Sequence, residues 1–417
     1  MRGKADIDLV RRQNRHIVLE VLRTHGPMPR VELGRKTGLS PASITSITTQ
    51  LIQEQAMLEL AEVTTRDPTR RGRPTVRVDL NPKAANVVAM KISIDGIELA
   101  LADFSGNVIA RKTVPLATYN FDPHKFGDVA AQSISNFLSQ NDLEPKDVAR
   151  IGIATQGVAD SREGVVAWSP AFKARNVAVV APIQNALGIP STLANDANMI
   201  AEGVMANDHR RYVGTTAVVY MGYGVGMGLV IEGKVYHGSN GAAAEFGHMN
   251  HIPQGAICRC GRSGCLEAYA ADYGILRSAE DLPDDTMPPS SAVNPSVMAA
   301  LEAAARRGDA KAVAAYQKAG RAIGFGLARL IALLNPDRIV LAGPGTRALD
   351  LIEPALRAAI EEGVVDALRR DVKIETVPIN KDMIITGTIG AALRHLDSEI
   401  FAFGPKLNQP EYQELTP

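Results

Sequence analysis

The chain has 417 residues, of which 46% are hydrophobic and 22% are charged, with 45 basic and 45 acidic side chains. This is the profile of a soluble globular protein and excludes a largely disordered chain, and the length predicts two or three domains. The first 82 residues carry 14 Lys and Arg against 9 Asp and Glu. This basic module on an acidic body predicts that only the N-terminal part meets a polyanion.

Targeting and membrane features are not expected. The first ten residues are charged, so they lack the apolar core of a secretory signal. The most apolar later stretch, 324–334, contains Arg329 and falls short of the ~20 apolar residues that a membrane span needs. We therefore expect a cytoplasmic protein. All three cysteines lie between Cys258 and Cys265, and an odd number in a reducing compartment favours a metal over a disulfide.

Three short helical patterns follow one another near the N-terminus. An apolar stripe at helical spacing predicts a first helix over 13–24. A second helix, 30–37, carries Val31 and Leu33 and ends at Gly38. Ser40 as N-cap and Pro41 at the first helical position predict a third helix, which runs from 41 to about 55.

The third helix is predicted to read the major groove of DNA. We expect its inward residues to be Ile44, Ile47, Leu51 and Ile52. Small hydroxyl and amide side chains on the other face suit close approach to phosphates and base edges. The candidate DNA-binding residues here are Ser40, Ser43, Thr45, Ser46 and Thr49, with Gln50 beside them.

Two predicted strands, 58–63 and 75–80, flank a basic segment with Arg70, Arg71 and Arg73 around a glycine. We interpret this segment as the wing of a winged helix-turn-helix whose arginines reach a narrow minor groove. The alternative is an interdomain linker with a solvated charge run. DNA binding is the preferred interpretation because three helices with clear capping signals precede the segment.

The remainder alternates strands and helices, which predicts α/β layers. Strands are expected at 87–93, 97–104, 150–154, 216–220 and 338–342, and helices at 126–139 and within 298–334. Every second residue of 222–228 is glycine, so this backbone can approach a phosphate or a sugar hydroxyl, although a tight hairpin also explains it. The composition of 280–295 predicts a surface insertion.

The strongest local signal is a cluster of histidine and cysteine. His248 or His251, with Cys258, Cys260 and Cys265, supplies one imidazole and three thiolates, which satisfy tetrahedral zinc. Three unrelated buried cysteines are the alternative, but chance clustering of every cysteine is improbable. Because four protein ligands close the coordination shell, we predict one structural zinc ion per chain. The spacing leaves the choice between the two histidines open.

These motifs resemble the ROK family, which contains repressors, uncharacterised reading frames and sugar kinases. The resemblance covers nearly the whole chain and is most specific at 195–198, at 245–248 and where the cysteine signature runs into Leu266 and Glu267. The fused DNA-binding module is similar to the repressor branch, which includes regulators of xylose and N-acetylglucosamine operons. The resemblance implies a two-lobed, actin-like sugar-kinase (ribonuclease H-like) α/β fold after the winged helix-turn-helix.

The resemblance also implies domain limits and residue roles. The winged helix-turn-helix occupies 1–82, the first lobe 83–205 with a C-terminal helix at 383–400, and the second lobe with the zinc site 206–382. His248 becomes the zinc ligand. The implied sugar-binding residues are Asn195, Asp196, Glu245, His248 and Glu267. Asp196 stands where family kinases carry the general base, and carboxylates and amides suit vicinal hydroxyls.

Of two departures from the family pattern, the first argues against kinase activity and the second against transferring a sugar specificity from a relative. Kinases of the family open with Asp-x-Gly-Gly-Thr, whereas this chain has Lys91, Ser93 and Ile94 at the acid and the paired glycines. Ala171 follows Pro170 where sugar-phosphorylating members usually carry Asn.

We therefore expect a DNA-binding transcription regulator, a repressor of sugar uptake or catabolism genes, with operator DNA and a monosaccharide or sugar derivative as ligands. A homodimer or homotetramer is expected. The alternative is an active sugar kinase that carries a DNA-binding domain, which Asp196 and the glycine turns at 222–228 and 343–345 favour. A third hypothesis, control by a protein partner, has no sequence feature in its support.

Overall fold

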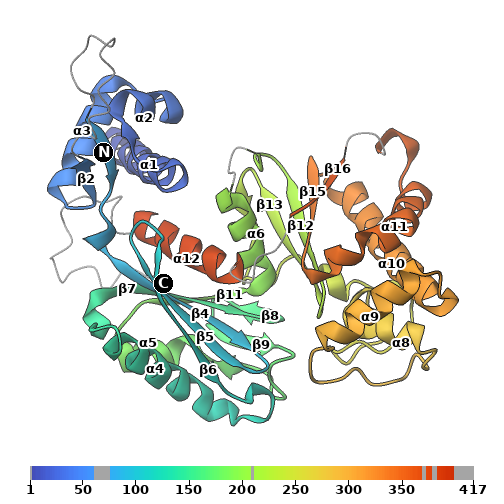
Figure 1. The fold of residues 1–417 in the computed structure, drawn as a ribbon. Helices are drawn as coiled ribbons and strands as arrows, with labels where there is room; N and C mark the ends of the chain where they lie inside the picture. Colours follow the sequence, from blue (N-terminus) through green and yellow to red (C-terminus); the bar gives the residue numbers. More distant parts are fainter. Residues whose placement is uncertain (1, 61–75, 208–210, 369–371, 378–382, 399–417) are drawn as a thin grey trace.

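The computed structural model describes residues 2–60, 76–207, 211–368, 372–377 and 383–398. An N-terminal helical module is followed by two lobes, each built on a five-stranded sheet, and the last helix returns to the first lobe (Figure 1). Both lobes mix strands with helices, as predicted for an α/β protein. Among the described residues, none of the helices has both the length and the apolar character that crossing a membrane requires.

The N-terminal module contains three helices and a small antiparallel sheet with the strand order β1-β3-β2. Its elements are α1 (Arg2–His25), β1 (Met28–Pro29), α2 (Arg30–Thr37), α3 (Pro41–Gln53), β2 (Met57–Leu60) and β3 (Arg77–Leu80). Three helices with a small antiparallel sheet fit the predicted winged helix-turn-helix. The capping signals are confirmed: Gly38 ends α2 in the left-handed conformation, and Ser40 Oγ accepts a hydrogen bond from Ser43 N at the start of α3.

Three details of this module differ from the prediction. α1 begins at Arg2, eleven residues earlier than the predicted 13, and the residues Val18 and Leu22 of its apolar stripe are buried. Val31 is 85% exposed and does not join that core. Gln50 turns inward, where its Oε1 accepts a hydrogen bond from Arg15 Nη1 at 3.4 Å.

The two faces of α3 otherwise agree with the prediction. Its buried side includes Ile44, Ile47 and Leu51. Its exposed side includes Thr45, Ser46 and Thr49. The predicted wing arginines, Arg70, Arg71 and Arg73, lie outside the described residues.

The first lobe has a mixed sheet in the order β11-β7-β4-β5-β6. Its strands are β4 (Asn86–Ser93), β5 (Gly96–Asp103), β6 (Val108–Pro115), β7 (Val148–Thr155) and β11 (Ser191–Asn195). The helices α4 (Pro123–Ser139) and α5 (Val180–Leu187) share a buried core with this sheet. A small antiparallel sheet contains β8 (Val158–Asp160), β9 (Val165–Trp168) and β10 (Val177–Ala178).

The second lobe has the strand order β14-β13-β12-β15-β16. Its strands are β12 (Thr216–Met221), β13 (Val225–Ile231), β14 (Lys234–Val235), β15 (Arg338–Ala342) and β16 (Lys373–Thr376). Its helices are α7 (Glu267–Ala270), α8 (Asp272–Ala279), α9 (Pro295–Arg306), α10 (Ala310–Leu334) and α11 (Leu349–Gly363). Short 3-10 turns occur at Pro82–Ala84, Thr118–Asn120, Pro145–Asp147, Phe246–His248, Pro344–Ala348 and Asp366–Leu368.

The alternating glycines at 222–228 form the turn and second strand of the β12–β13 hairpin, and two of them, Gly224 and Gly226, also line a pocket. A Cβ on Gly228 in β13 would lie 2.5 Å from Ala201 Cβ on α6 (Asp196–Asn207). A Cβ on Gly222 would lie 2.7 Å from Pro344 Cγ. These glycines therefore permit close packing of the hairpin against α6 and against Pro344.

α12 (Met383–Leu396) joins the parts of the molecule. It packs against β4, β7 and α6. Its contact with α6 is close, because a Cβ on Gly387 would lie 1.8 Å from Met199 O. One buried cluster contains apolar side chains of α12, of the first-lobe sheet and of the N-terminal module. The N-terminal module and the first lobe are therefore packed into one body through this helix.

Candidate functional site

A cleft lined by residues of both lobes opens at the start of α6. The first lobe contributes Gln156, Trp168 and Pro170 to its walls, and the second lobe contributes residues of the β12–β13 hairpin and of the cysteine-rich loop. The structure brings all five predicted sugar-binding residues to this cleft: Asn195, Asp196, Glu245, His248 and Glu267.

Asn195 and Asp196 stand where β11 passes into α6. Asn195 Nδ2 donates a hydrogen bond to Gly157 O, and Asn195 Oδ1 accepts one from Ala197 N at 2.7 Å. The second bond satisfies a free N–H in the first turn of α6, as an N-cap does. Asn195 is thus fixed on both sides, and Asp196, the first residue of α6, lines the cleft.

Asp196 and Glu245, two acidic residues that line the cleft, keep their protons to higher pH than free carboxylic acids do. Burial raises the pKa of Asp196 to about 7, although the N–H of Ala197 and the charge of Lys91 act against the rise. Burial also raises the pKa of Glu245, which His248 partly opposes. With a pKa of about 7, Asp196 is present in both protonation states at neutral pH and can donate or accept a hydrogen bond, which suits sugar hydroxyls.

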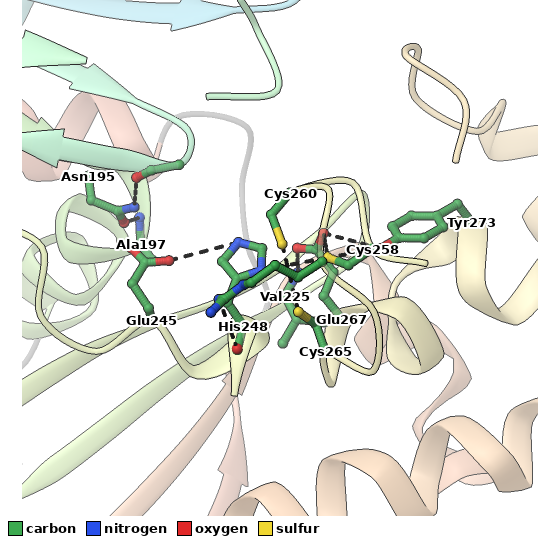
Figure 2. A network of polar contacts seen from close by, with 12 residues as sticks. Asn195, Ala197, Val225, Glu245, His248, Cys258, Cys260, Cys265, Glu267 and Tyr273 are labelled. Carbon is green, nitrogen blue, oxygen red and sulfur yellow. Dashed lines mark hydrogen bonds and ion pairs between the residues drawn. The ribbon is translucent and has the colours of Figure 1, made fainter. Parts of the chain in front are cut away.

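The four predicted metal ligands converge (Figure 2). Cys258 Sγ lies 3.7 Å from His248 Nδ1, and Cys260 Sγ lies 3.7 Å from Cys265 Sγ. All four ligand atoms lie within 4.8 Å of one another. Two sulfurs bound to zinc at ~2.3 Å with tetrahedral angles are about 3.8 Å apart, so this spacing fits a tetrahedral metal ion.

The geometry selects between the two histidines. The ring of His251 packs edge-on against Tyr269, with centroids 5.2 Å apart, and does not join the cluster. His248 directs Nδ1 to the sulfurs, while its Nε2 lies 3.9 Å from Glu245 Oε2 in the cleft. His248 therefore connects the metal cluster to the polar wall, in the way that a carboxylate orients a ligating imidazole.

Glu267 makes a second connection between the cluster and the cleft. Its Oε2 accepts a hydrogen bond from Val225 N at 3.1 Å, which holds the β12–β13 hairpin. Its Oε1 lies 3.7 Å from Cys258 Sγ and 3.3 Å from the hydroxyl of Tyr273. Glu267 is buried by these contacts, so most of its hydrogen-bonding capacity is already used by the protein.

The hairpin between β4 and β5 carries the atypical residues Lys91, Ser93 and Ile94. Their side chains contact other residues of the first lobe. Lys91 Nζ lies 3.5 Å from a Glu98 carboxylate oxygen, Ser93 Oγ donates to Gly96 O at 3.1 Å, and Ile94 packs on the first-lobe core. These three described residues do not line the cleft. The hairpin therefore brings a cation, rather than an acid, near Asp196.

Sequence reasoning missed several residues of the cleft, among them Trp168, Tyr223 and Arg259. The ring of Trp168 contacts that of His248 edge-on, with centroids 5.2 Å apart, so the first lobe touches the metal ligand of the second. Trp168 is the only tryptophan of the chain, and this rarity was the one sequence feature that could have marked it as a cleft residue. Ala171 is fully buried and bonds back to Ser169 Oγ through its N–H, away from the cleft lining.

Comparisons with known proteins agree with this architecture. The family model described as ROK family matches residues 87–396. The DNA-binding transcriptional repressor Mlc of Escherichia coli is 25% identical over 91% of this chain and 93% of its own length. A xylose repressor of Caldicellulosiruptor bescii is 24% identical over 97% of this chain and 98% of its own length.

Solved structures extend the likeness to three dimensions. A ROK family transcriptional regulator, described as a homologue of E. coli MLC protein, has a TM-score of 0.74 and 27% identity, and the match covers 93% of this chain and 97% of that one. A ROK family glucokinase from Streptomyces griseus has a TM-score of 0.57 and 22% identity over 74% of this chain and 99% of that one. The second likeness concerns the fold alone.

Proposed function

The chain belongs to the ROK family, and we propose that it is a sequence-specific DNA-binding regulator, a repressor of sugar uptake or catabolism genes that a sugar controls. The matches to Mlc and to the xylose repressor support this proposal because they span the N-terminal module as well as the family domain. We propose the domain limits 1–82, 83–205 with 383–400, and 206–382.

One observation carries the proposal: a cleft with a polar wall and a winged-helix module are packed into one body through α12. The wall suits a monosaccharide or sugar derivative, because its carboxyl and amide groups can bond vicinal hydroxyls. We propose that one structural zinc ion, bound by His248, Cys258, Cys260 and Cys265, holds the loop that carries part of this wall.

For DNA, we propose that α3 enters the major groove and that the wing reaches the minor groove of the operator. The proposed contacts come from Ser40, Ser43, Thr45, Ser46 and Thr49 of α3 and its cap, and from Arg70, Arg71 and Arg73 of the wing. A homodimer or homotetramer would bind two half-sites, as two-fold symmetric operators require.

The kinase alternative has less support. The hairpin at 91–96 has Lys91 where a phosphate-binding loop needs an acid, and it lacks the paired glycines of such a loop. It therefore lacks the magnesium ligand at that position, and its backbone cannot approach a phosphate closely. The glucokinase neighbour shares the fold, and a fold hosts several functions.

A continuous set of contacts can carry the sugar signal to the DNA-binding module. α6 begins with Asp196 in the cleft and packs on α12, where Glu202 of α6 forms an ion pair with Arg394. Just beyond α12, the fully buried Asp397 pairs with Arg23 of α1. Closure of the lobes around a sugar would move α6 against α12, and α1 would follow.

The contact between α12 and α1 is specific. Arg23 Nη2 donates to Asp397 Oδ1 and to Phe104 O, both at 3.2 Å, and its Cζ lies 5.1 Å from the Phe104 ring centroid. Near the middle of α1, the buried Arg15 pairs with Glu54, which caps the end of α3. α1 therefore connects the end of the family domain to the recognition helix.

The proposed function predicts DNA capture, release by sugar and steep salt dependence. The protein should recover specific operator fragments from genomic DNA, and one member of a hexose, pentose and amino-sugar panel should change their affinity. Each neutralised phosphate adds roughly −0.9 to the slope of log affinity against log salt, so replacing Arg71 and Arg73 by Ala should reduce the slope by about 2 per protomer. Absence of specific fragments would contradict DNA regulation, and sugar-dependent ADP production at an ordinary enzymatic rate would establish the kinase.

The coupling path predicts a regulator that binds both ligands but no longer connects them. In Asp397→Asn, the side chain that pairs with Arg23 loses its negative charge. The sugar should then leave DNA affinity unchanged, whereas allosteric coupling typically changes it roughly 5–150-fold. Trp168 fluorescence should show unchanged sugar binding. Glu362→Gln, which breaks the exposed pair with Arg321, is the control and should keep the response. A full sugar response in Asp397→Asn would exclude this path.

A further inference from the structure

Two arginines of the cysteine-rich loop point in different directions. Arg262 Nη2 donates to His248 O at 3.4 Å, beside the metal cluster. Arg259 lines the cleft and lies between two aromatic rings. Its Cζ is 3.9 Å from the ring centroid of Tyr223 and 4.5 Å from that of Tyr273. Stacking between two rings fixes the plane of the Arg259 guanidinium.

One edge of this guanidinium has no partner. Arg259 Nη1 donates to Tyr223 O at 3.0 Å, but Nε and Nη2 are buried and meet no hydrogen-bond acceptor in the part of the chain that the structure describes. Burial raises the pKa of Asp272 to about 6, and nearby Arg259 opposes this rise, yet no ion pair joins the two among the described residues. Nε and Nη2 are the two parallel donors that bind a carboxylate or a phosphate side-on.

An unpaired buried charge destabilises a protein, so the free edge needs an explanation. The metal cluster does not supply it, because Arg259 turns toward the tyrosines while Arg262 faces the cluster. Asp196 and Glu245 line the same cleft as Arg259, so a ligand that fills the cleft would meet acidic groups as well as a cation. The hydroxyls of a neutral sugar could accept hydrogen bonds from Nε and Nη2 but would leave the charge of the guanidinium uncompensated.

We propose that the ligand of the cleft is an anionic monosaccharide, with a phosphate or carboxylate bound by Nε and Nη2 of Arg259. This inference rests on the proposed function, since it specifies the class of the sugar effector. Because both tyrosine rings stack on the faces of the guanidinium, the anion would bind in its plane, at the edge formed by Nε and Nη2.

The test compares ligands that differ only in the anionic group. Each hexose, pentose and amino sugar of a panel is offered in its neutral, phosphorylated and acid forms, with inorganic phosphate alone as a further probe, and binding is followed by Trp168 fluorescence. One anionic form should bind at least about tenfold tighter than its neutral parent, as expected for a bidentate charge-assisted hydrogen bond. The phosphorylated and acid forms distinguish the two kinds of anion.

Variants assign the effect to the guanidinium. Arg259→Met should bring the anionic form to the affinity of the neutral one, and Arg259→Lys should keep only part of the preference. Arg307→Met, an exposed arginine of the same lobe, is the control, and metal content verifies that each variant folds. Equal or tighter binding of neutral sugars, or equally tight binding of inorganic phosphate, would overturn this inference alone. Failure of every sugar form to bind would contradict the proposed function itself.

Discussion

Removal of the metal ion is expected to unfold the loop from His248 to Cys265 and to abolish the sugar response. Metal binding to such a site is coupled to folding of its ligands, with apparent free energies of ~10–16 kcal/mol in zinc-finger peptides. The loop also holds Glu245 through His248, and Glu267 follows the last cysteine directly. Elemental analysis should find about one zinc ion per chain, and a chelator or Cys260→Ser should remove it.

The two neighbouring histidines provide a matched pair for this test. His248→Ala should lose the metal, whereas His251→Ala should keep it, because His251 packs on Tyr269 outside the cluster. Trp168 lies edge-on to His248, so its fluorescence should change with metal removal in the wild type. A metal-free wild type that binds sugar normally would contradict the structural role, and metal loss in His251→Ala would contradict the ligand assignment.

The parts of the fold that the sequence predicts are those whose causes are local. The ends of α2 and the start of α3 depend on Gly38, Ser40 and Pro41, which act on residues a few positions away. Metal ligands are predictable for a similar reason, since few residue types bind zinc and they lie close in sequence. Ligand spacing did not select His248 over His251, which only the family resemblance implied, because the choice depends on how the backbone turns and on where the Tyr269 ring lies.

Features that depend on distant contacts escaped prediction. Trp168 and Arg259 come from different lobes, and no local sequence pattern indicates that they line one cleft. Gly387 fits against Met199 only because α12 returns across the chain to meet α6. The five cleft residues implied by the family resemblance do meet, but composition and spacing alone would have left Asp196 as one acid among many.

Replacement of Asp196 by Asn is expected to stabilise the protein at neutral and alkaline pH. The folded-state pKa of Asp196 is raised from 3.8 to about 7. Below about pH 4 both folded and unfolded states hold the proton, so variant and wild type should be equally stable. As the pH rises toward 7, the wild type loses ~1.4 kcal/mol per unit relative to the amide, because only its unfolded state ionises freely. Above pH 7 the difference levels at no more than about 4 kcal/mol, a ceiling because the side chain is partly open to the cleft.

Denaturant midpoints at pH 4, 6 and 8 measure this effect, with the exposed Asp128→Asn as a control that should show no such trend. The same variant should lose much of the sugar's effect on DNA while sugar-free DNA binding stays near wild type, since Asp196 is far from α3 in the chain and lies in the cleft. Parallel stability profiles for Asp196→Asn and wild type would mean that the carboxyl group ionises normally. A more stable variant with a full sugar response would mean that burial of Asp196 serves something other than the sugar. A buried side chain that destabilises the fold but binds the ligand should give both results when it is replaced: a gain of stability and a loss of the sugar response.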